Sequence, residues 1–440
     1  MTLFRDRNAL ALRTFSRRDV LLALGGACAS ATGIWPTREQ IAVAQPPSAA
    51  SDFTAGMTSV RTLDGPAFRG RLILVTEPGE FTFETSEKER KTLPPGELVR
   101  FGFPADVALK GTQALLLLRD GGRLVGRLES LDREAIVLDS YFFGPVEVPR
   151  ADAAGVVFQG SSDPALLADF VQELLAGDAA ADRLLLDNGD RLEGAINSAS
   201  YPMDGDLSAQ RPTLDVVVAG ATVALPGDGL RAVRFADGKK SAIAPPRLWV
   251  GLRDGSLVAA SELLLKGLAL SVRRRADQAP WQSQRRDALA FVQPIGGKIV
   301  YLSDLEPQRY RHVPFLTLER PYFADRNALG LPLRAAGRTH LKGLGMFPAA
   351  ALTYSLTGGY RKFEAELAVD DAAGRAGSVT FQVLLDGKPQ GESPTLHGGD
   401  AAQSFSLDVA GAKTLTLVVY FADHGDALDY ADWLDARVVK

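Results

Sequence analysis

Residues 362–369 read KFEAELAV, a stretch in which apolar and charged side chains alternate. Phe363, Ala365, Leu367 and Val369 occupy every second position, with glutamates at the two positions between the first three. Successive side chains of a strand point to opposite faces of its sheet. This period of two therefore predicts a strand with one buried face.

Neighbouring stretches extend this strand into a sheet. The same alternation recurs at 379–385 and at 405–409, whereas 415–421 is largely apolar on both faces and predicts a central strand. Asp386-Gly387 offers the positive φ angles that a tight hairpin needs. Short strands joined by turns rich in Gly and Asp predict a β-sandwich of the jelly-roll kind.

Six short motifs follow one another along this part of the chain. They are LKGLGM at 341–346, LTYSLTGGYRKF at 352–363, VDD at 369–371, GSVTFQV at 377–383, DGK at 386–388 with DVAGAKTL at 408–415, and DYADWLDAR at 429–437. In this order and spacing they resemble the NPCBM family, a carbohydrate-binding module found on glycoside hydrolases of family 98 and on many bacterial exported proteins. The resemblance implies a β-sandwich at 298–440 that binds a glycan or polysaccharide.

The first 44 residues have the composition of an export signal. The stretch SRRDVLL at 16–22 resembles a twin-arginine motif, and five arginines precede an apolar stretch at 20–31. Ala42-Val43-Ala44 provides a small-residue cleavage site. We therefore expect a signal peptide at 1–44 and a low-complexity linker at 45–57. The chain would then work in the periplasm, at the cell surface or in the medium.

Two other interpretations of this segment compete with cleavage after Ala44. A membrane anchor would need ~20 apolar residues, more than this stretch supplies. Cys28, the only cysteine, follows Gly26-Ala27 and would permit lipoprotein cleavage, but Leu24 lies one place too far upstream for a good lipobox. After cleavage at Ala44 the mature chain has no transmembrane segment and no cysteine, which excludes disulfides and thiol chemistry.

The charge balance argues against nucleic acid as a partner. Removing 1–44 takes away six arginines and three acids, so the net charge falls from −4 to about −7. A mildly acidic protein lacks the basic surface that phosphate backbones attract. The basic clusters at 273–275 and 285–286 are local exceptions, which we expect on a solvated loop.

A turn dipeptide recurs between the signal and the sandwich. It occurs as Asp64-Gly65, Asp120-Gly121, Asn188-Gly189 and Asp254-Gly255, at spacings of 56, 68 and 66 residues. In the first three copies we expect a second strand to begin at Gly70, Gly126 and Gly194, whereas the fourth has Ala260 there. This pattern predicts repeated small β-units of five strands.

These units occupy 58–162 and 180–297, on either side of one helix. We expect that helix at 163–179, capped by Asp163 and stopped by Gly177, with Leu166, Phe170 and Leu174 on one face and Leu167 and Leu175 beside them. Each unit weakly resembles a bent-sheet barrel of the Sm-like type. Sm-like proteins often bind RNA, which an acidic exported chain does not favour, so a spacer or scaffold is the better interpretation. The fold class is therefore all-β: repeated bent-sheet units followed by a sandwich.

Catalytic motifs are scarce in this sequence. The four histidines, His312, His340, His397 and His424, occur in none of the patterns HExxH, HxH or GxSxG. A carboxylate pair of the glycosidase kind is not excluded by sequence, but repeats of about 60 residues rarely provide a deep cleft. We therefore predict a protein that is not an enzyme.

The acidic series near the C-terminus is the best candidate for a site. Its aspartates recur every three residues, with a histidine and two aromatics between them: Asp423, His424, Asp426, Asp429, Tyr430, Asp432, Trp433 and Asp435. Aromatic faces suit the C–H surface of a sugar and carboxylates suit its hydroxyls. We therefore assign carbohydrate binding to His424, Asp429, Tyr430, Asp432 and Trp433.

Calcium is a second possible ligand of this series. Because Ca²⁺ takes six to eight oxygens, it would use Asp423, Asp426 and Asp429. The alternative is structural: Asp423 to Asp429 form a solvated turn, and Trp433 packs into the core at the start of the last strand.

Three functions follow from these observations, in order of preference. The first is an exported, non-catalytic protein of the cell envelope that binds glycan through its sandwich. The second is a structural scaffold that contacts other envelope proteins and has no sugar site. The third is a glycan hydrolase with its catalytic part at 58–297.

Overall fold

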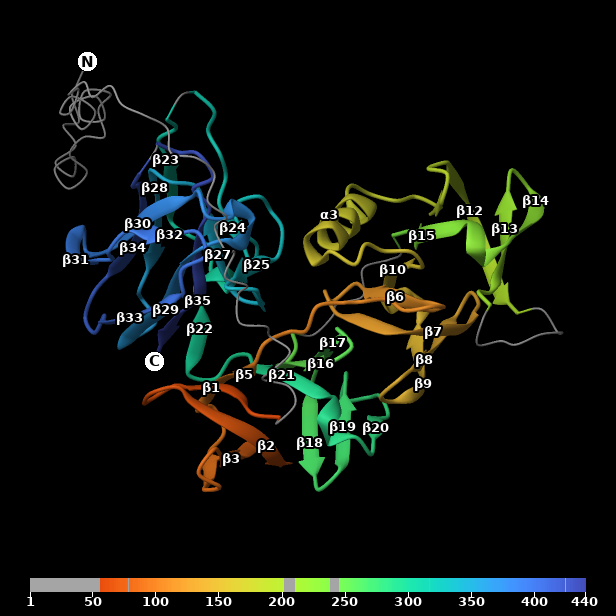
Figure 1. Ribbon diagram of the computed structural model, residues 1–440, viewed down its shortest axis with the longest axis horizontal. Coiled ribbons are helices and arrows are strands. Elements are labelled where there is room, and N and C mark those ends of the chain that lie inside the picture. Colours follow the sequence, from red (N-terminus) through yellow and green to blue (C-terminus); the bar gives the residue numbers. More distant parts are fainter. Residues whose placement is uncertain (1–55, 78, 202–209, 238–244, 316, 424) are drawn as a thin grey trace, which may run out of the picture. The chain divides into compact units, whose positions relative to one another are not determined.

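The computed structural model describes residues 56–77, 79–201, 210–237, 245–315, 317–423 and 425–440 (Figure 1). They form two compact units, one running to Val300 with Arg338–His340 added, the other comprising Tyr301–Gly337 and Leu341–Lys440. We describe each unit by itself. One α-helix and many strands make up the described residues, which confirms the all-β prediction.

The strands of the first unit fall into four successive groups. The first group holds β1 (Thr58–Thr62), β2 (Phe68–Thr76), β3 (Glu80–Thr85), β4 (Arg90–Leu93) and β5 (Leu98–Gly102). The second holds β6 (Gln113–Leu118), β7 (Arg123–Leu131), β8 (Ala135–Ser140), β9 (Gly144–Pro149), the 3-10 turn η1 (Arg150–Asp152) and β10 (Ala153–Val157).

The third and fourth groups follow the single α-helix, α3 (Pro164–Leu175). The third holds β11 (Asp182–Leu186), β12 (Arg191–Ser200), β13 (Thr213–Val218), β14 (Ala221–Leu225), η3 (Gly227–Gly229) and β15 (Leu230–Arg234). The fourth holds β16 (Leu248–Leu252), β17 (Leu257–Ala260), β18 (Glu262–Lys266), β19 (Ala269–Arg273), β20 (Trp281–Ser283), η4 (Arg286–Ala288) and β21 (Leu289–Pro294).

Each group closes on itself in the same way. Its first strand pairs antiparallel with its second strand and with its last strand, as β1 does with β2 and β5, and β6 with β7 and β10. The second strand then bends at a register shift, between Leu72 and Leu74, Leu128 and Ser130, or Ile196 and Ser198 in the first three groups. An extra residue at such a bulge bends the strand and increases its twist. In the fourth group the bent strand is divided into β17 and β18.

The recurring glycine lies inside this second strand rather than at its start, which corrects our expectation. A Cβ at Gly126 would lie 2.6 Å from the Asp139 carbonyl oxygen, and one at Gly194 would lie 2.5 Å from that of Val217. Glycine permits this close approach of two backbones. At Gly70 the nearest atom would be 3.1 Å away, so the requirement is weaker there.

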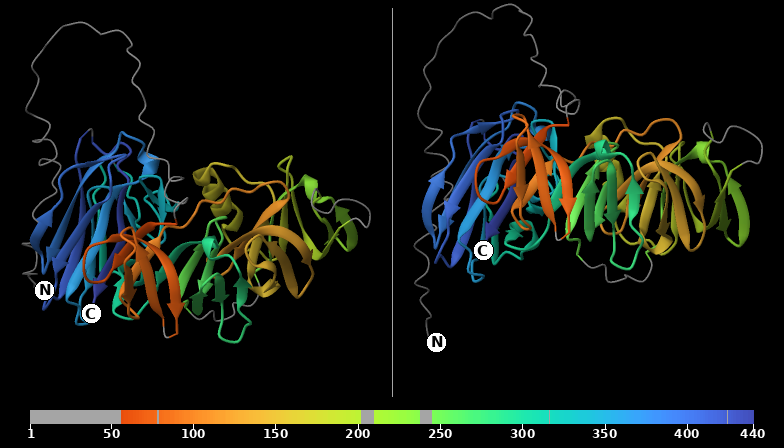
Figure 2. Two further views of the ribbon diagram at one scale, coloured as in Figure 1. Left: turned by 60° about the horizontal axis from the view of Figure 1, so that its bottom comes forward. Right: turned by 90° about the horizontal axis from the view of Figure 1, so that it is seen from below.

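The groups join in pairs, last strand to last strand and second strand to second strand. β5 pairs with β21 and β2 with β18, which joins the first group to the fourth. β10 pairs with β15 and β7 with β12, which joins the second to the third. A single pairing of Leu257 with Arg123 links the two pairs. Figure 2 shows the strands in the resulting order: first, fourth, second, third.

Buried arginines hold these groups together. Arg274 is 7% exposed, and its guanidinium lies 2.9 Å from an Asp120 oxygen and 3.3 Å from an Asp152 oxygen. Arg275 also pairs with Asp152, at 2.6 Å, and Arg150 pairs with Asp182 at 2.6 Å. The prediction that the basic cluster at 273–275 lies on a solvated loop is therefore wrong, because acidic partners from the second group surround Arg274.

Helix α3 begins and ends near the predicted residues. Asp163 caps it by accepting from the backbone N–H of Ala165 at 2.8 Å. Of the predicted apolar residues only Leu166 departs from the prediction, since it is 60% exposed, whereas Leu167 is buried. Leu167 packs in a small core with Phe170, Val171, Leu174 and Leu175 of the same helix.

The second unit is a sandwich of two antiparallel sheets (Figure 1). One sheet has the strand order β24 (Phe323–Ala324), β27 (Gly343–Met346), β35 (Ala431–Val439), β29 (Lys362–Val369) and β33 (Gln403–Asp408). The other has the order β23 (Arg309–His312), β28 (Ala350–Ser355), β34 (Thr414–Phe421), β30 (Ser378–Leu385) and β31 (Lys388–Glu392), with β32 (Leu396–His397) against β30. The remaining short elements of the chain are β22 (Ile299–Tyr301), η5 (Leu302–Asp304), β25 (Leu333–Ala335), β26 (Arg338–His340) and η6 (Asp371–Ala373), of which β26 belongs to the first unit.

The predicted strands of the sandwich are confirmed. β34 pairs with β28 on one side and with β30 on the other, the central place that its apolar faces predicted. Asp386 and Gly387 have φ of 47° and 76° and turn β30 into β31. Between the sheets, the fully buried Trp433 meets the ring of Phe381 edge to face at 5.0 Å.

Candidate functional site

One end of the sandwich gathers aromatic and polar side chains from four chain segments. They are the loop at 313–322 after β23, the turn at 347–349 before β28, the residues 397–400 around β32, and the loop at 422–430 between β34 and β35. Side-chain contacts connect these segments, as the next paragraphs describe. All four lie within the second unit.

Phe315 is the most exposed ring at this end. Its side chain is 43% exposed, and its ring meets that of Phe421, the last residue of β34, edge to face at 5.9 Å. Gly425 of the acidic loop passes beside the same ring, since a Cβ there would lie 3.7 Å from Phe315. An exposed aromatic ring held by a second ring offers a rigid apolar face to a ligand.

An exposed histidine and two carboxylates form a polar group at the same end of the sandwich, where Asp423 follows Phe421 by two residues. The His397 Nε2 lies 3.2 Å from an Asp423 oxygen, and its Nδ1 lies 3.7 Å from an Asp400 oxygen. Asp423 is anchored, because its backbone N–H donates to the Ser378 hydroxyl at 2.8 Å and its carbonyl accepts from that hydroxyl at 3.0 Å. These side chains supply both donors and acceptors for hydroxyl groups.

A second polar cluster surrounds His312 at the end of β23. Burial lowers the pKa of His312, although a hydrogen bond to the Pro348 backbone and the nearby Glu319 act in the opposite direction. Its Nδ1 accepts from the backbone N–H of Arg320 at 3.0 Å, and Asp426 of the acidic loop is close enough to act on it electrostatically. Neutral imidazole is thus favoured, with Nδ1 as the acceptor.

Tyr430 connects the acidic loop to the turn before β28. It is half-buried, and its ring meets Phe347 edge to face at 5.7 Å. The guanidinium of Arg320 lies over the Phe347 ring, 4.4 Å from its centre. The end of the sandwich therefore has a framework of packed rings with charged groups on it.

The structure separates the residues of the predicted site into two sets. Asp423 and Asp426 are exposed and Tyr430 is half-buried, whereas Asp429, Asp432 and Trp433 have no exposed surface. His424 lies outside the described residues. The buried three are out of reach of a sugar in this conformation, and Trp433 takes the core position of the structural alternative. The prediction that the loop itself contacts a sugar stays open for its exposed members.

Asp429 has a structural partner at the base of the loop. One of its oxygens accepts from the backbone N–H of Ser378 at 2.7 Å. Within the described residues, Asp423, Asp426 and Asp429 do not form a group of three with ligand atoms within reach of one ion. The calcium prediction therefore stays a prediction, and such an ion would need further oxygens.

Asp432 is buried next to another buried carboxylate, Asp370. Burial raises the pKa of Asp432 well above its usual range, and the charges of Asp370 and Asp371 raise it further. Asp370 accepts from Asn327 Nδ2 at 3.0 Å and from the backbone N–H groups of Arg334 and Ala372 at 2.9 Å each. Among the described residues no donor reaches either oxygen of Asp432. A proton on Asp432, directed to Asp370, would satisfy this pair.

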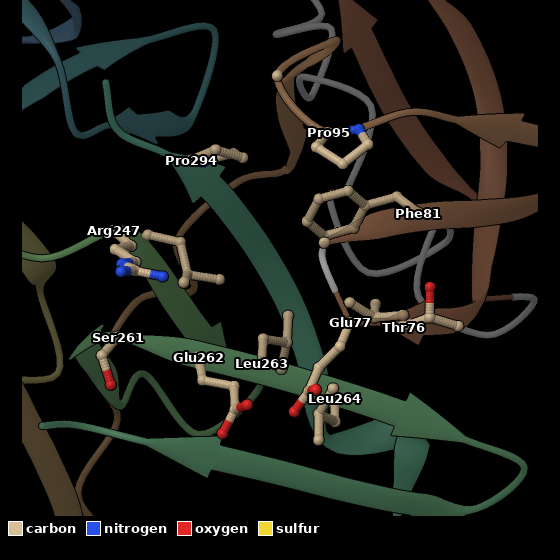
Figure 3. A pocket seen from close by; sticks show the side chains of 14 residues that line it. Thr76, Glu77, Phe81, Pro95, Arg247, Ser261, Glu262, Leu263, Leu264 and Pro294 are labelled. Carbon is tan, nitrogen blue, oxygen red and sulfur yellow. The ribbon is translucent and has the colours of Figure 1, made fainter. Parts of the chain in front are cut away.

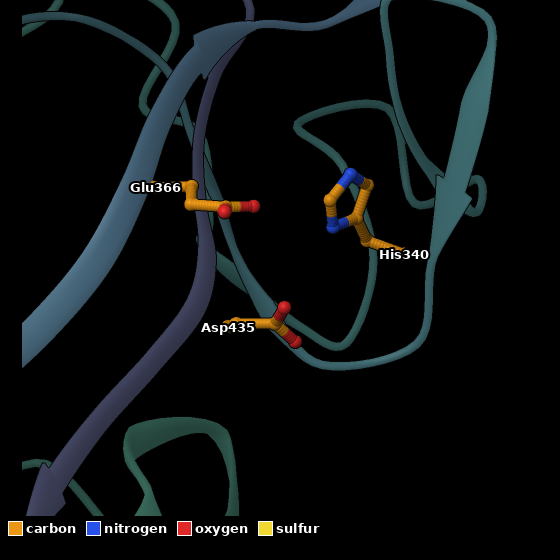
Figure 4. A group of neighbouring side chains, drawn as sticks. All are labelled: His340, Glu366 and Asp435. Carbon is orange, nitrogen blue, oxygen red and sulfur yellow. The ribbon is translucent and has the colours of Figure 1, made fainter. Parts of the chain in front are cut away.

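A separate group consists of His340, Glu366 and Asp435 (Figure 4). Each of these side chains has interactions of its own. His340 belongs to the first unit, whereas Glu366 and Asp435 belong to the second. Because the group takes members from both units, we assign no site to it.

The sequence did not reveal Phe315, Phe421, His397 or Arg320 as candidates. Phe421 was visible only as the end of a strand, and Phe315 lies in a loop that shows no period. The available signal was compositional: apolar Phe315 and Leu318 stand between Pro314 and Pro321, where a loop would usually be polar.

Within the part of the chain that the structure describes, no helix has both the length and the apolar character that crossing a membrane requires.

Residues 298–439 match the model of the NPCBM/NEW2 domain. This match confirms the resemblance that the six motifs indicated for 298–440. Among characterised sequences, the chain is similar to a protein named "Putative endo-alpha-N-acetylgalactosaminidase" from Renibacterium salmoninarum, with 33% identity over 108 residues. The aligned part covers 24% of this chain and 7% of that protein, so the chain spans only a small part of its relative's length.

Two solved structures illustrate the structural likeness. The CBM51 from Clostridium perfringens GH95, in complex with methyl-galactose, is 27% identical over 32% of this chain and 99% of that one, with a TM-score of 0.29. The tandem CBM51 modules of a family 98 glycoside hydrolase from Streptococcus pneumoniae are 12% identical over 87% of this chain and 88% of that one, also with a TM-score of 0.29.

Proposed function

We propose that this protein binds a glycan, without catalysis, at the end of the sandwich formed by Phe315, Phe421, His397, Asp423 and Tyr430. The match of 298–439 to the NPCBM/NEW2 domain is the observation that carries the proposal. The exposed ring of Phe315 supports it, because a sugar presents a C–H face that stacks on aromatic rings. The exposed carboxylates and imidazole support it as partners for hydroxyl groups.

A glycan array probed with the full chain tests this proposal. The name of the relative from Renibacterium makes glycans that contain N-acetylgalactosamine the first probes. Phe315→Ala should weaken binding about tenfold or more, in keeping with the 1–3 kcal/mol that stacking and hydrogen-bonded anchors contribute. Tyr141→Ala is the matched control, since Tyr141 is an aromatic residue of the first unit that is 63% exposed. Equal binding by both variants would contradict the proposed site.

The same array separates the scaffold alternative from glycan binding. A chain that binds no glycan on the array, yet retains other envelope proteins in a cross-linking experiment, would be a scaffold. Release of reducing sugar from a bound glycan would instead favour the hydrolase alternative. We expect binding with no release.

We further propose that the protein acts outside the cytoplasm, in the periplasm, at the cell surface or in the medium. The twin-arginine stretch at 16–22 supports this, although it lies outside the described residues. Replacing Arg17 and Arg18 together by lysine should leave the precursor in the cytoplasm, as fractionation and blotting would detect. Unchanged export of that variant would point to the general secretory route.

A further inference from the structure

The first unit contains a cavity of about 440 Å³ between its first and fourth groups of strands (Figure 3). Its lining comes from the end of β2, the start of β3 and the turn before β5 on one side, and from β16, β18 and the end of β21 on the other. Cavities of 300–1,000 Å³ are the usual size for small-molecule sites.

The walls of this cavity are fixed by backbone pairing. β5 pairs with β21 through Phe101 and Val292, and β2 pairs with β18 through Val75 and Leu265. Gly102 has φ of 65°, and a Cβ there would lie 2.0 Å from the Ala290 carbonyl oxygen, so the two groups meet with their backbones in close contact. A ligand would therefore find a preformed space, which lowers the entropy that binding costs.

One side of the cavity is apolar and made of rings. Figure 3 shows the phenyl ring of Phe81 beside the rings of Pro95 and Pro294, with Leu263 and Leu264 opposite them. Phe81 belongs to the core of the unit and is only 6% exposed, so its neighbours hold the ring in place and only a small part of it is open to the cavity. The flat phenyl ring and the saturated proline rings together form an apolar wall that suits the C–H face of a sugar ring.

The other side of the cavity is polar and is formed by side chains from both groups of strands. Glu77 follows β2 and Glu262 begins β18, and in Figure 3 their carboxylates extend into the same part of the cavity, with Arg247 and Ser261 nearby. A hydrogen bond from Arg273, 2.8 Å away, lowers the pKa of Glu262 most, and a hydrogen bond with Glu77 lowers it further, so the two glutamates of this cavity contact each other. Glu262 is therefore an ionised acceptor whose charge is already balanced.

The charges around this cavity limit the class of ligand. Two carboxylates disfavour an anion such as a phosphate. A free cation gains little from Glu262, because Arg273 neutralises it, and Arg247 adds a further positive charge. A neutral molecule with several hydroxyl groups and one apolar face uses both sides of the cavity.

We propose that this cavity is a second carbohydrate site, which takes one or two neutral sugar units and lies in the first unit, separate from the sandwich. Phe81, Pro95 and Pro294 pack against the ring, and Glu77 and Glu262 accept hydrogen bonds from its hydroxyls. Arg247 and Ser261 donate to its oxygens. The inference goes beyond the sandwich site and does not depend on it.

Hydrogen exchange of the full chain, measured by mass spectrometry with and without sugar, locates binding to one unit or the other. The probes are galactose, N-acetylgalactosamine, N-acetylglucosamine and glucose, each titrated to saturation. We expect at least one of them to protect peptides that cover 74–81, 93–98 and 247–264. Protection confined to peptides around 310–322 and 421–430, or absent for all four probes, would overturn the second site. The sandwich proposal is judged separately, by Phe315→Ala.

Glu77→Gln tests the site at nearly constant volume. Loss of a carboxylate oxygen as acceptor should weaken binding of the protecting sugar about tenfold at this site, with no change at the sandwich. Glu80→Gln is the matched control, because Glu80 is an exposed glutamate of the same hairpin that does not line the cavity. If both variants weaken binding equally, the effect is one of overall charge and the proposal fails. Ser261→Tyr, which fills the cavity, should abolish the protection at 247–264.

Discussion

The two units of this protein bury carboxylates under different conditions. In the first unit, Asp152 and Asp182 are each less than 9% exposed and each faces an arginine from a neighbouring group of strands. In the second, Asp432 is fully buried and faces another aspartate, Asp370. An arginine keeps its partner ionised, whereas two carboxylates that face each other favour a bound proton. Asp152 and Asp182 therefore join strand groups of the first unit through charge, whereas the pair of Asp370 and Asp432 makes the second unit sensitive to pH. The second unit also contains an arginine-paired carboxylate, Glu364 with Arg437.

The largest expected effect comes from removing Arg274. Arg274→Met leaves Asp120 and Asp152 buried, with side chains 7% and 6% exposed, and takes away the cation that they share. Breaking a buried ion pair on one side destabilises by about 3–5 kcal/mol. Unfolding of the first unit in urea measures this loss in the free energy of unfolding.

Arg275→Met is the control for that experiment, because Arg275 pairs with the same Asp152 but is 32% exposed. We expect Arg275→Met to destabilise the first unit less than Arg274→Met does. Equal losses of stability from Arg274→Met and Arg275→Met would show that burial of the arginine does not determine the loss. The contrast between buried and exposed charges would then fail.

Lys342 offers an intermediate case in the second unit. Its ammonium is 9% exposed and lies 2.5 Å from an Asp304 oxygen and 2.7 Å from an Asp325 oxygen. Burial by itself would lower the pKa of Lys342, but the two aspartates outweigh it and raise the pKa. Because both aspartates remain partly exposed to water, Lys342→Met should cost only about 1.5–3 kcal/mol, the range for hydrogen bonds to charged groups. Thermal unfolding at neutral pH measures it, and a loss as large as that of Arg274→Met would contradict the argument.

Asp432→Asn should stabilise the sandwich, and only above mildly acidic pH. The pKa of Asp432 is raised in the folded state, so the native protein holds a proton that the unfolded chain has already released. The stability tied to this proton is fully present below the unfolded pKa of about 3.9 and is lost as the pH rises towards the folded pKa. Asparagine supplies a permanent donor to Asp370, so the variant should gain about 1–3 kcal/mol at neutral pH.

Unfolding of wild type and Asp432→Asn across a pH series measures that difference. The gain should shrink as the pH falls towards 4, since aspartic acid and asparagine then carry the same charge. A variant that is less stable than wild type at every pH would mean that Asp432 is ionised in the fold and has a partner other than Asp370.

The sequence predicted the strands better than it predicted the partners of charged residues. Alternation sufficed for β29 and β30, because one face of each stretch is apolar. The last strand was predicted in the structural alternative, with Trp433 in the core, but β35 lies between β27 and β29 and is buried at all nine positions, so its aspartates resembled an exposed acidic series. Arg274 resembled a loop residue for a similar reason, since its partner Asp120 is 154 residues away in the sequence.

The candidate site could be predicted only in part, for the same physical reason. The loop at 422–430 was recognisable from its composition, and Asp423, Asp426 and Tyr430 do lie at the end of the sandwich. Phe315 and His397 come from segments about 100 and 30 residues away, and only the folded sheets bring them beside that loop. No pattern among neighbouring residues of the sequence predicts such a contact.

The smallest expected effect concerns an ion pair at the surface. Arg191 and Glu173 lie 3.1 Å apart, with side chains 74% and 71% exposed. Water already solvates both groups, and ordering two long side chains opposes the attraction, so pairs of this kind contribute ~0–1 kcal/mol. Glu173→Gln should therefore change the unfolding midpoint in urea by no more than the scatter between replicates, and added salt should remove any difference. A loss of stability comparable to that of Lys342→Met would mean that ion pairs stabilise the first unit whether or not they are buried. The contrast between the two units would then depend on the number of ion pairs in each, and no longer on how much water reaches them.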